Sequence, residues 1–196
     1  MAFIGMRHVV AAKVASHTDG SAPTYSNDGV IVGKAIAGNL TINRNNNPLY
    51  ADDAIAEDDN GVTGIEIELG TDDLMEDVLA YLGLLKKQTD GSGASAVTKY
   101  LETSKAAEDV GVGYIRVRQK NNVVKFQTVW IYSAKFSLNS ENSRTKGESI
   151  EWETPTIVGR CKGLLIDDSG DITFREKRIF DDYDEAVEYI DGLAHI

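Results

Sequence analysis

The chain has 196 residues, of which 42% are hydrophobic and 26% are charged, and its formal net charge is −11. These values are typical of a folded protein with a sizeable core, exclude a largely disordered chain, and suit a single domain spanning residues 1–196. The acidic balance argues against tight binding to nucleic acid, and the single cysteine excludes an intrachain disulfide framework.

The charge alternates in blocks along the chain. Residues 1–50 sum to +2 and residues 51–90 to −10, whereas residues 91–150 sum to +4 and residues 151–196 to −7. Such blocks suit copies that meet basic surface to acidic surface, and they equally suit solvated faces that keep a monomer soluble. No apolar run approaches membrane-spanning length, and the first residues lack the apolar core of a secretory signal. We therefore expect synthesis in the cytoplasm and no membrane partner.

The first 70 residues contain the clearest strand patterns. The apolar residues between Val9 and Val14 indicate a first strand, which a turn-rich stretch follows. Residues 36–43 and residues 64–69 then alternate apolar and polar side chains, the period-two pattern of a half-buried strand. In the last of these strands the isoleucines share one face and the glutamates share the other.

The connection between those two strands, residues 44–61, is the most unusual stretch. It is long, acidic and without a clear period, and such connections are uncommon in compact domains unless they are functional or disordered. It also carries Leu49, Tyr50 and Ile55, which a solvated linker would not need. We interpret it as a loop-like arm that finishes folding against another molecule.

The clearest helix pattern covers residues 71–87. Thr71 can act as its N-cap and two aspartates follow in the first turn, where the helix dipole favours carboxylates. Leucine, methionine and valine recur at helical spacing up to Leu82, and Gly83 or the lysine pair that follows would end the helix. The next stretch, residues 88–113, is polar and glycine-rich, and it predicts a flexible loop.

From Tyr114 onward the pattern is strongly β. Residues 114–119 alternate, Asn121-Asn122 indicates a hairpin turn, and residues 123–136 form the return strand. In the return strand alternation places Phe126, Trp130, Tyr132 and Phe136 on one face, with Val123, Val129 and Ile131 opposite. Because both faces are partly apolar, we expect both to be covered, by this chain's own helix or by a neighbour.

The last third predicts a second long connection over residues 138–147, a strand over residues 148–154, and a hairpin from Ile157 to Phe174 around residues 167–170. A short C-terminal helix is predicted from about Tyr183 to Asp191, capped by Asp181 or Asp182.

Sequence spacing offers no strong sign of a chemical site. Counting back from Gly61 and Gly170 puts Ala56 and Leu165 at the first ligand position of a calcium loop, where an oxygen ligand is required. The three histidines have no common spacing, and Cys161, with no histidine nearby, is interpreted as an ordinary strand cysteine. No P-loop, zinc spacing or catalytic triad is present. We therefore expect no catalytic, cofactor-binding or metal-binding residues and no enzyme activity.

Several long runs closely resemble the major tail proteins of long-tailed bacteriophages and prophages of Gram-positive hosts. The resemblance covers nearly the whole chain and is weakest over residues 86–112. Its most specific runs are residues 33–44, residues 47–53 with 56–58, residues 113–118, residues 145–152 and residues 184–186, together with the opening residues 1–7.

The resemblance implies a tail tube subunit in the virion, assembled in the host cytoplasm as rings of six that stack into a hollow tube for DNA passage. It implies a mainly β (α+β) fold, a β-sandwich or barrel with one flanking helix, long loops between strands and a short C-terminal helix. The implied partners are other copies of the chain, the tape measure, tail terminator and distal tail proteins, and DNA that passes without specific binding.

Two sets of residues are candidates for these contacts. The expected subunit interface comprises Asn43, Arg44, Pro48, Leu49, Tyr50, Asp52, Asp53, Ile55, Arg144 and Lys146. The expected wall of the lumen comprises Glu66, Glu68, Glu151 and Glu153, because an acidic stripe would repel phosphates and let DNA slide.

Three other functions remain open at this stage. The inner tube of a contractile tail or of a phage-like bacteriocin would have nearly the same sequence properties. A β-sandwich module that binds carbohydrate or calcium would remain monomeric and would be stabilised by its ligand. The third alternative is an enzyme with an unrecognised carboxylate site, although neighbouring glutamates on one strand do not face each other across a cleft as a glycosidase requires.

Overall fold

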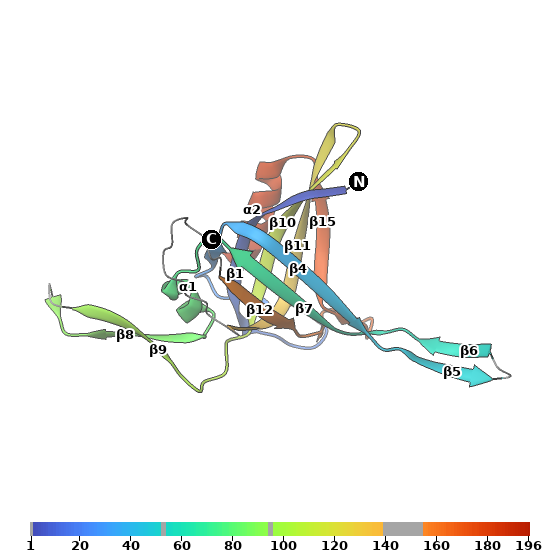
Figure 1. The fold of residues 1–196 in the computed structure, drawn as a ribbon, viewed down its shortest axis with the longest axis horizontal. Helices are drawn as coiled ribbons and strands as arrows, with labels where there is room; N and C mark the ends of the chain where they lie inside the picture. The colour runs from blue at the N-terminus through green and yellow to red at the C-terminus, as the bar shows by residue number, and fades with distance from the viewer. Residues whose placement is uncertain (1, 52–53, 94–95, 139–154) are drawn as a thin grey trace, which may run out of the picture.

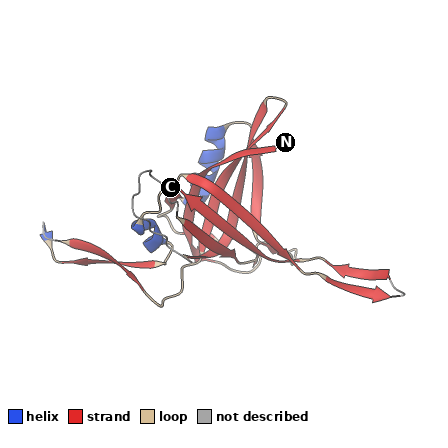
Figure 2. Cartoon of the chain, viewed as in Figure 1, coloured by secondary structure: helices blue, strands red, loops and turns tan. Residues whose placement is uncertain are grey.

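The computed structural model describes the backbone of residues 2–51, 54–93, 96–138 and 155–196, and the side chains of the same ranges apart from residues 47–59. The protein is mainly β, as predicted, with two short helices (Figures 1 and 2). The elements in chain order are β1 (Ala2–Ser16), β2 (Thr24–Tyr25), β3 (Val30–Gly33), β4 (Ala35–Arg44), β5 (Asn47–Ala51), β6 (Ala54–Asp59), β7 (Val62–Thr71), α1 (Glu76–Tyr81), β8 (Leu85–Asp90), β9 (Val97–Glu102), β10 (Val110–Lys120), β11 (Val123–Ser137), β12 (Thr156–Cys161), β13 (Leu164–Leu165), β14 (Ile172–Thr173), β15 (Arg175–Phe180) and α2 (Tyr183–Ala194).

One antiparallel sheet organises the described part of the chain. Its strands follow the order β2-β1-β10-β11-β12-β7-β4, with β3 paired to β1 and β15 paired to β11. The sheet curls so that β1 and β4, near its two ends, come close together. A Cβ atom added to Gly38 of β4 would lie 2.5 Å from the Met6 sulfur of β1. Glycine at position 38 thus allows β1 to cross closely over β4.

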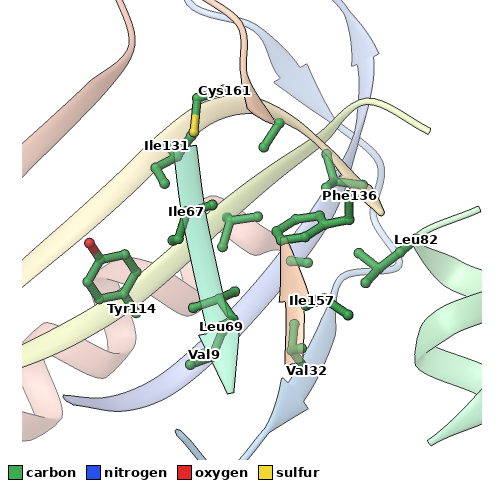
Figure 3. Close-up of a cluster of buried hydrophobic side chains, with 14 of the residues drawn as sticks. Val9, Val32, Ile67, Leu69, Leu82, Tyr114, Ile131, Phe136, Ile157 and Cys161 are labelled. Carbon is green, nitrogen blue, oxygen red and sulfur yellow. The ribbon is translucent and has the colours of Figure 1, made fainter. Parts of the chain in front are cut away.

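The middle of the sheet, at β11, is buried on both faces, as the apolar pattern of this strand predicts. The larger core lies inside the curl, where Ile67 and Leu69 of β7 pack with Ile131, Phe136 and residues of α1 (Figure 3). The smaller core lies on the opposite face, where Trp130 and Ile115 pack against α2. Helix α2 therefore closes one side of the sheet, and the curl of the sheet closes the other.

A β-bulge in β11 separates the part of this strand that pairs with β15 from the part that pairs with β12. Between Ile131 and Ala134 β11 carries one more residue than β10 does over Val110–Val112, so the strand bends at this point. The first half of β11 pairs with β15 and its last residues pair with β12. The extra residue also reverses the alternation, so the prediction that Phe136 shares a face with Trp130 is wrong: Phe136 packs in the larger core.

The hairpin from β10 to β11 is confirmed in detail. Asn121 and Asn122 have φ values of 51° and 61°, the left-handed conformation that a two-residue turn between right-twisted strands requires. Asparagine tolerates this conformation better than most residues do, which explains its presence at both positions. The first strand is confirmed as β1. The predicted hairpin around residues 167–170 is confirmed as β13 and β14, but the strand predicted over residues 157–166 is divided between β12 of the large sheet and β13.

Three predicted segments have different structures. The helix predicted over residues 71–87 is only α1, because Thr71 ends β7 and the two lysines belong to β8. The flexible loop predicted over residues 88–113 contains β9, which pairs with β8 along its whole length. The connection over residues 44–61 is a hairpin of β5 and β6. Sequence reasoning also missed β15 entirely.

The C-terminal helix is confirmed and extends to Ala194, beyond the predicted end at Asp191. The Asp182 side chain accepts hydrogen bonds from the backbone N–H groups of Asp184 and Glu185, which decides between the two predicted capping residues. His8 of β1 contacts Asp191 of the helix at 2.6 Å and joins the helix to the sheet. Among the described residues, neither helix has the length and apolar character needed to cross a membrane.

Candidate assembly surface

Two hairpins extend from opposite sides of the curled sheet (Figure 1). The β5–β6 hairpin continues the antiparallel pair of β4 and β7 beyond the body of the protein. The β8–β9 hairpin leaves the body on the far side, next to α1. We call these two hairpins the acidic arm (residues 44–61) and the second arm (residues 85–102). A two-stranded hairpin alone is at best marginally stable in water, so such arms usually need something to pack against.

The acidic arm contains most of the predicted interface. Asn43 and Arg44 are exposed at the end of β4, and the Arg44 guanidinium donates a hydrogen bond of 3.0 Å to the Asn60 carbonyl. Pro48, Leu49 and Tyr50 lie on β5, and Ile55 lies on β6. The predicted residues Asp52, Asp53, Arg144, Lys146, Glu151 and Glu153 lie outside the described residues.

The arm carries a strong charge. Its residues include one arginine and five carboxylates, a net charge of −4. The second arm carries three lysines against two carboxylates over residues 85–102, a net charge of +1. The two arms therefore differ in the sign of their net charge.

The glutamates of β7 lie where alternation predicts. Ile65, Ile67 and Leu69 are buried in the larger core, whereas Glu68 is exposed and Glu66 is half-buried on the other face. The Arg160 guanidinium lies 3.4 Å from Glu66, so this glutamate is partly neutralised by β12. Glu68 accepts a hydrogen bond of 3.3 Å from the Asn39 amide. Whether this face lines a lumen is a property of an assembly and stays a prediction.

The second arm was missed because its strands contain mixed polar residues without strict alternation. Its base is fixed to α1: the Lys87 ammonium lies 2.6 Å from the Asp77 carboxylate, and the Tyr100 hydroxyl donates a hydrogen bond of 2.7 Å to the same group. The hydrogen bond from Lys87, followed by that from Tyr100, holds the pKa of Asp77 below its usual value. The only available sign of this turn is the pair Asp90-Gly91, a common hairpin dipeptide whose glycine has a φ of 85°.

The sheet also has exposed edges and apolar side chains. In the described part of the chain, β4 pairs only with β7 and β15 only with β11, so each has a free edge. Ile36 on β4 is 55% exposed and Ile179 on β15 is 54% exposed. Free edges and exposed isoleucines are features that proteins usually cover or pair.

An open recess of about 810 Å³ next to β12 is large enough to hold a ligand. Glu66, Asp109, Lys135 and Arg160 line it around Cys161. Burial raises the pKa of the Cys161 thiol to about 12, so the thiol remains protonated and is a poor nucleophile. Among the residues that the structure describes, no three histidine, cysteine or carboxylate side chains are grouped as metal ligands would be.

No protein-family model matches the chain, and no curated protein matches it. The geometry of the arms and edges therefore carries the functional argument.

Proposed function

We propose that this chain is a structural subunit that assembles with copies of itself into the tail tube of a long-tailed bacteriophage or prophage. Rings of the subunit, expected to contain six copies, stack into a hollow tube through which DNA passes. The single observation that carries the proposal is the pair of long arms that extend from opposite sides of one curled sheet (Figure 2).

The second arm supports assembly because it adds little to the subunit's own core. Among the side chains that the structure describes, no fully buried core residue belongs to β8 or β9. Ordering a segment costs conformational free energy, which must be offset by contacts it makes. Contacts with a neighbouring copy would offset that cost for both arms.

Opposite placement of the arms supports a stacked arrangement. A subunit that presents different surfaces at its two sides forms heterologous, head-to-tail contacts, which generate rings and filaments. Within such a tube Glu66 and Glu68 would face DNA and repel its phosphates, so that DNA slides without specific binding. The tape measure, tail terminator and distal tail proteins would contact the tube, which would form in the host cytoplasm and remain in the virion.

A double substitution on the acidic arm tests the proposal. Leu49→Glu with Tyr50→Glu should leave the subunit folded, because both residues lie on the β5–β6 hairpin beyond the body of the protein, and should abolish tube formation. Negative-stain electron microscopy of concentrated protein measures tubes, and far-ultraviolet circular dichroism measures the fold.

Ile172→Glu is the control, because this isoleucine is 64% exposed on β14 and belongs to neither arm. It should preserve tubes. Normal tubes from the arm variant would remove the arm from the assembly.

A further inference from the structure

Four cationic side chains lie together on one face of the sheet. On β10, Arg116 and Arg118 are two residues apart and therefore point to the same side. The strand pairing aligns Arg116 of β10 with Gln127 of β11 and Ile179 of β15. It also aligns Tyr114 of β10 with Val129 of β11 and Lys177 of β15. By the same alternation Arg175 and Lys177 of β15 share the face of Arg116 and Arg118. We call these four residues the cationic cluster.

Unlike two cations close to it, the cluster has no carboxylate within ion-pair distance among the described residues. Nearby cations are paired: Lys125 lies 2.7 Å from Asp181, and Arg178 lies 3.9 Å from Glu176 on the opposite face of β15. Within the part of the chain that the structure describes, no member of the cluster forms an ion pair.

The two arginines of β10 are held by an aromatic ring. The Arg116 guanidinium lies 3.6 Å from the centroid of Phe3, and that of Arg118 lies 5.3 Å from it. The Nε atom of Arg118 is buried and has no hydrogen-bond partner among the described residues. A buried donor without an acceptor is costly, so this geometry favours an acceptor supplied from outside the subunit.

The four charges also act on one another. Burial, followed by the positive charges of Arg175, Arg116 and Arg118, lowers the pKa of the Lys177 ammonium. Like charges collected without a counter-charge repel, and an acidic ligand would relieve that repulsion.

The cluster is accessible from the side of the sheet. Helix α2 covers the other face of β15, where Glu176 contacts the Tyr132 and Tyr189 hydroxyls. Lys177 is exposed, the three arginines are half-buried, and the outer edge of β15 is unpaired in the described part of the chain. A strand or hairpin of another molecule can therefore approach the cluster.

We propose that the cationic cluster is the receptor for the acidic arm of a second copy of this chain. The arm offers five carboxylates against one arginine, and it extends away from its own subunit (Figure 1), so it is placed to reach a neighbour. This inference rests on the proposed function, because it names the contact through which copies would join. Paired charges of this kind set the register of partners and accelerate their association.

Charge exchange tests the pairing. In the full chain, Arg118→Glu with Lys177→Glu reverses the cluster, and Glu57→Lys with Asp58→Lys reverses part of the arm. Each double variant alone should weaken self-association at least tenfold in sedimentation velocity, and the variant with all four changes should recover to within threefold of the original chain.

Lys135→Glu with Lys162→Glu is the matched control, because it changes the net charge equally at exposed lysines outside the cluster. It should leave association within threefold. If circular dichroism shows that the cluster variant is unfolded, the single changes Lys177→Glu and Asp58→Lys, alone and combined, give the same comparison at an exposed lysine.

The outcomes separate this inference from the proposed function. The inference is overturned if the cluster variant forms normal tubes, or if the variant with all four changes does not regain self-association. Either result leaves the proposed tube assembly intact. A cluster variant that assembles normally yet loses binding to a short DNA duplex overturns it in favour of a nucleic-acid contact. An original chain that remains monomeric at every concentration overturns both.

Discussion

Trp130 is among the largest fully buried side chains, and its polar atom is satisfied by a chain of hydrogen bonds. The Trp130 indole N–H donates to the Tyr25 hydroxyl at 2.9 Å, and that hydroxyl donates to the Tyr132 carbonyl at 2.9 Å. The two rings meet edge to face with centroids 5.1 Å apart. Because β2 is only two residues long, this contact adds to its pairing with β1 in holding it to the body of the sheet.

Removing the Tyr25 hydroxyl should therefore destabilise the fold. Tyr25→Phe leaves the buried Trp130 N–H without its acceptor, and we expect a loss of about 1–3 kcal/mol in the free energy of unfolding, measured with urea. Tyr183→Phe is the control, since the Tyr183 hydroxyl has no hydrogen bond to the residues that the structure describes. Equal stability of the two variants would contradict the role of the Tyr25 hydroxyl.

The buried thiol of Cys161 predicts a pH dependence. Burial raises its pKa from 9.0 to about 12. Below about pH 9 both the folded and the unfolded chain hold the proton, whereas above it the unfolded chain releases a proton that the folded chain keeps. The stability contributed by the neutral thiol is therefore complete at neutral pH and is lost as the pH rises.

We expect the original chain to lose about 1 kcal/mol more than Cys161→Ala between pH 9 and pH 10. Urea denaturation at both pH values measures this difference, and the constant cost of the cavity cancels in it. The buried tyrosines titrate in both proteins and also cancel. Parallel losses in the two proteins would show that the thiol titrates normally.

At the scale of elements, α2 shows how a local signal determines a boundary. Asp182 accepts hydrogen bonds of 2.7 Å and 3.3 Å from the first turn, and Ala186, Ile190 and Ala194 bury one face of the helix. His195 ends the helix in the left-handed conformation with a φ of 56°. The helix then covers Trp130 and Ile115, which would otherwise face water.

Loss of the N-cap should weaken the packing of α2 against the sheet. Asp182→Ala should lower the free energy of unfolding by about 1 kcal/mol, because two backbone donors lose their acceptor. Asp181→Ala removes only the exposed ion pair with Lys125 and should cost about 0.5 kcal/mol or less. Urea denaturation of both variants checks the order, and a larger effect of Asp181 would be inconsistent with the observed cap.

Elements whose pattern is local could be predicted from the sequence. The strands at residues 36–43 and 64–69, the Asn121-Asn122 turn and the C-terminal helix follow from alternation, turn residues and capping residues. The sequence predicts too long a helix after Thr71, because apolar residues keep helical spacing up to the start of β8, which pairs with β9. Tertiary pairing overrode helix propensity there.

The rest depends on contacts between distant residues. One extra residue in β11 moves Phe136 to the other face of the sheet. Its position depends on distant strands, because β15 pairs with the middle of β11 and β12 pairs with its last residues. The cationic cluster joins Arg116 to Lys177 across three strands, and no spacing along the chain indicates it. Of the candidate site, the position of the acidic arm and the outward face of Glu66 and Glu68 were predictable, whereas the second arm was not.

At the scale of the whole molecule, one curled sheet with two covered faces carries arms on opposite sides (Figure 1). The two core clusters of the body use residues from nearly every strand of the large sheet. In the described part of the chain, β4 and β15 each have an unpaired edge, and no fully buried core residue belongs to β8 or β9. The proposed tube assigns those parts to neighbouring copies.

Sedimentation velocity of the unmodified chain from micromolar to millimolar concentration tests this account most directly. We predict that the sedimentation coefficient rises with concentration from the monomer to rings and then to stacked rings. A single monomeric species across the whole range would contradict it.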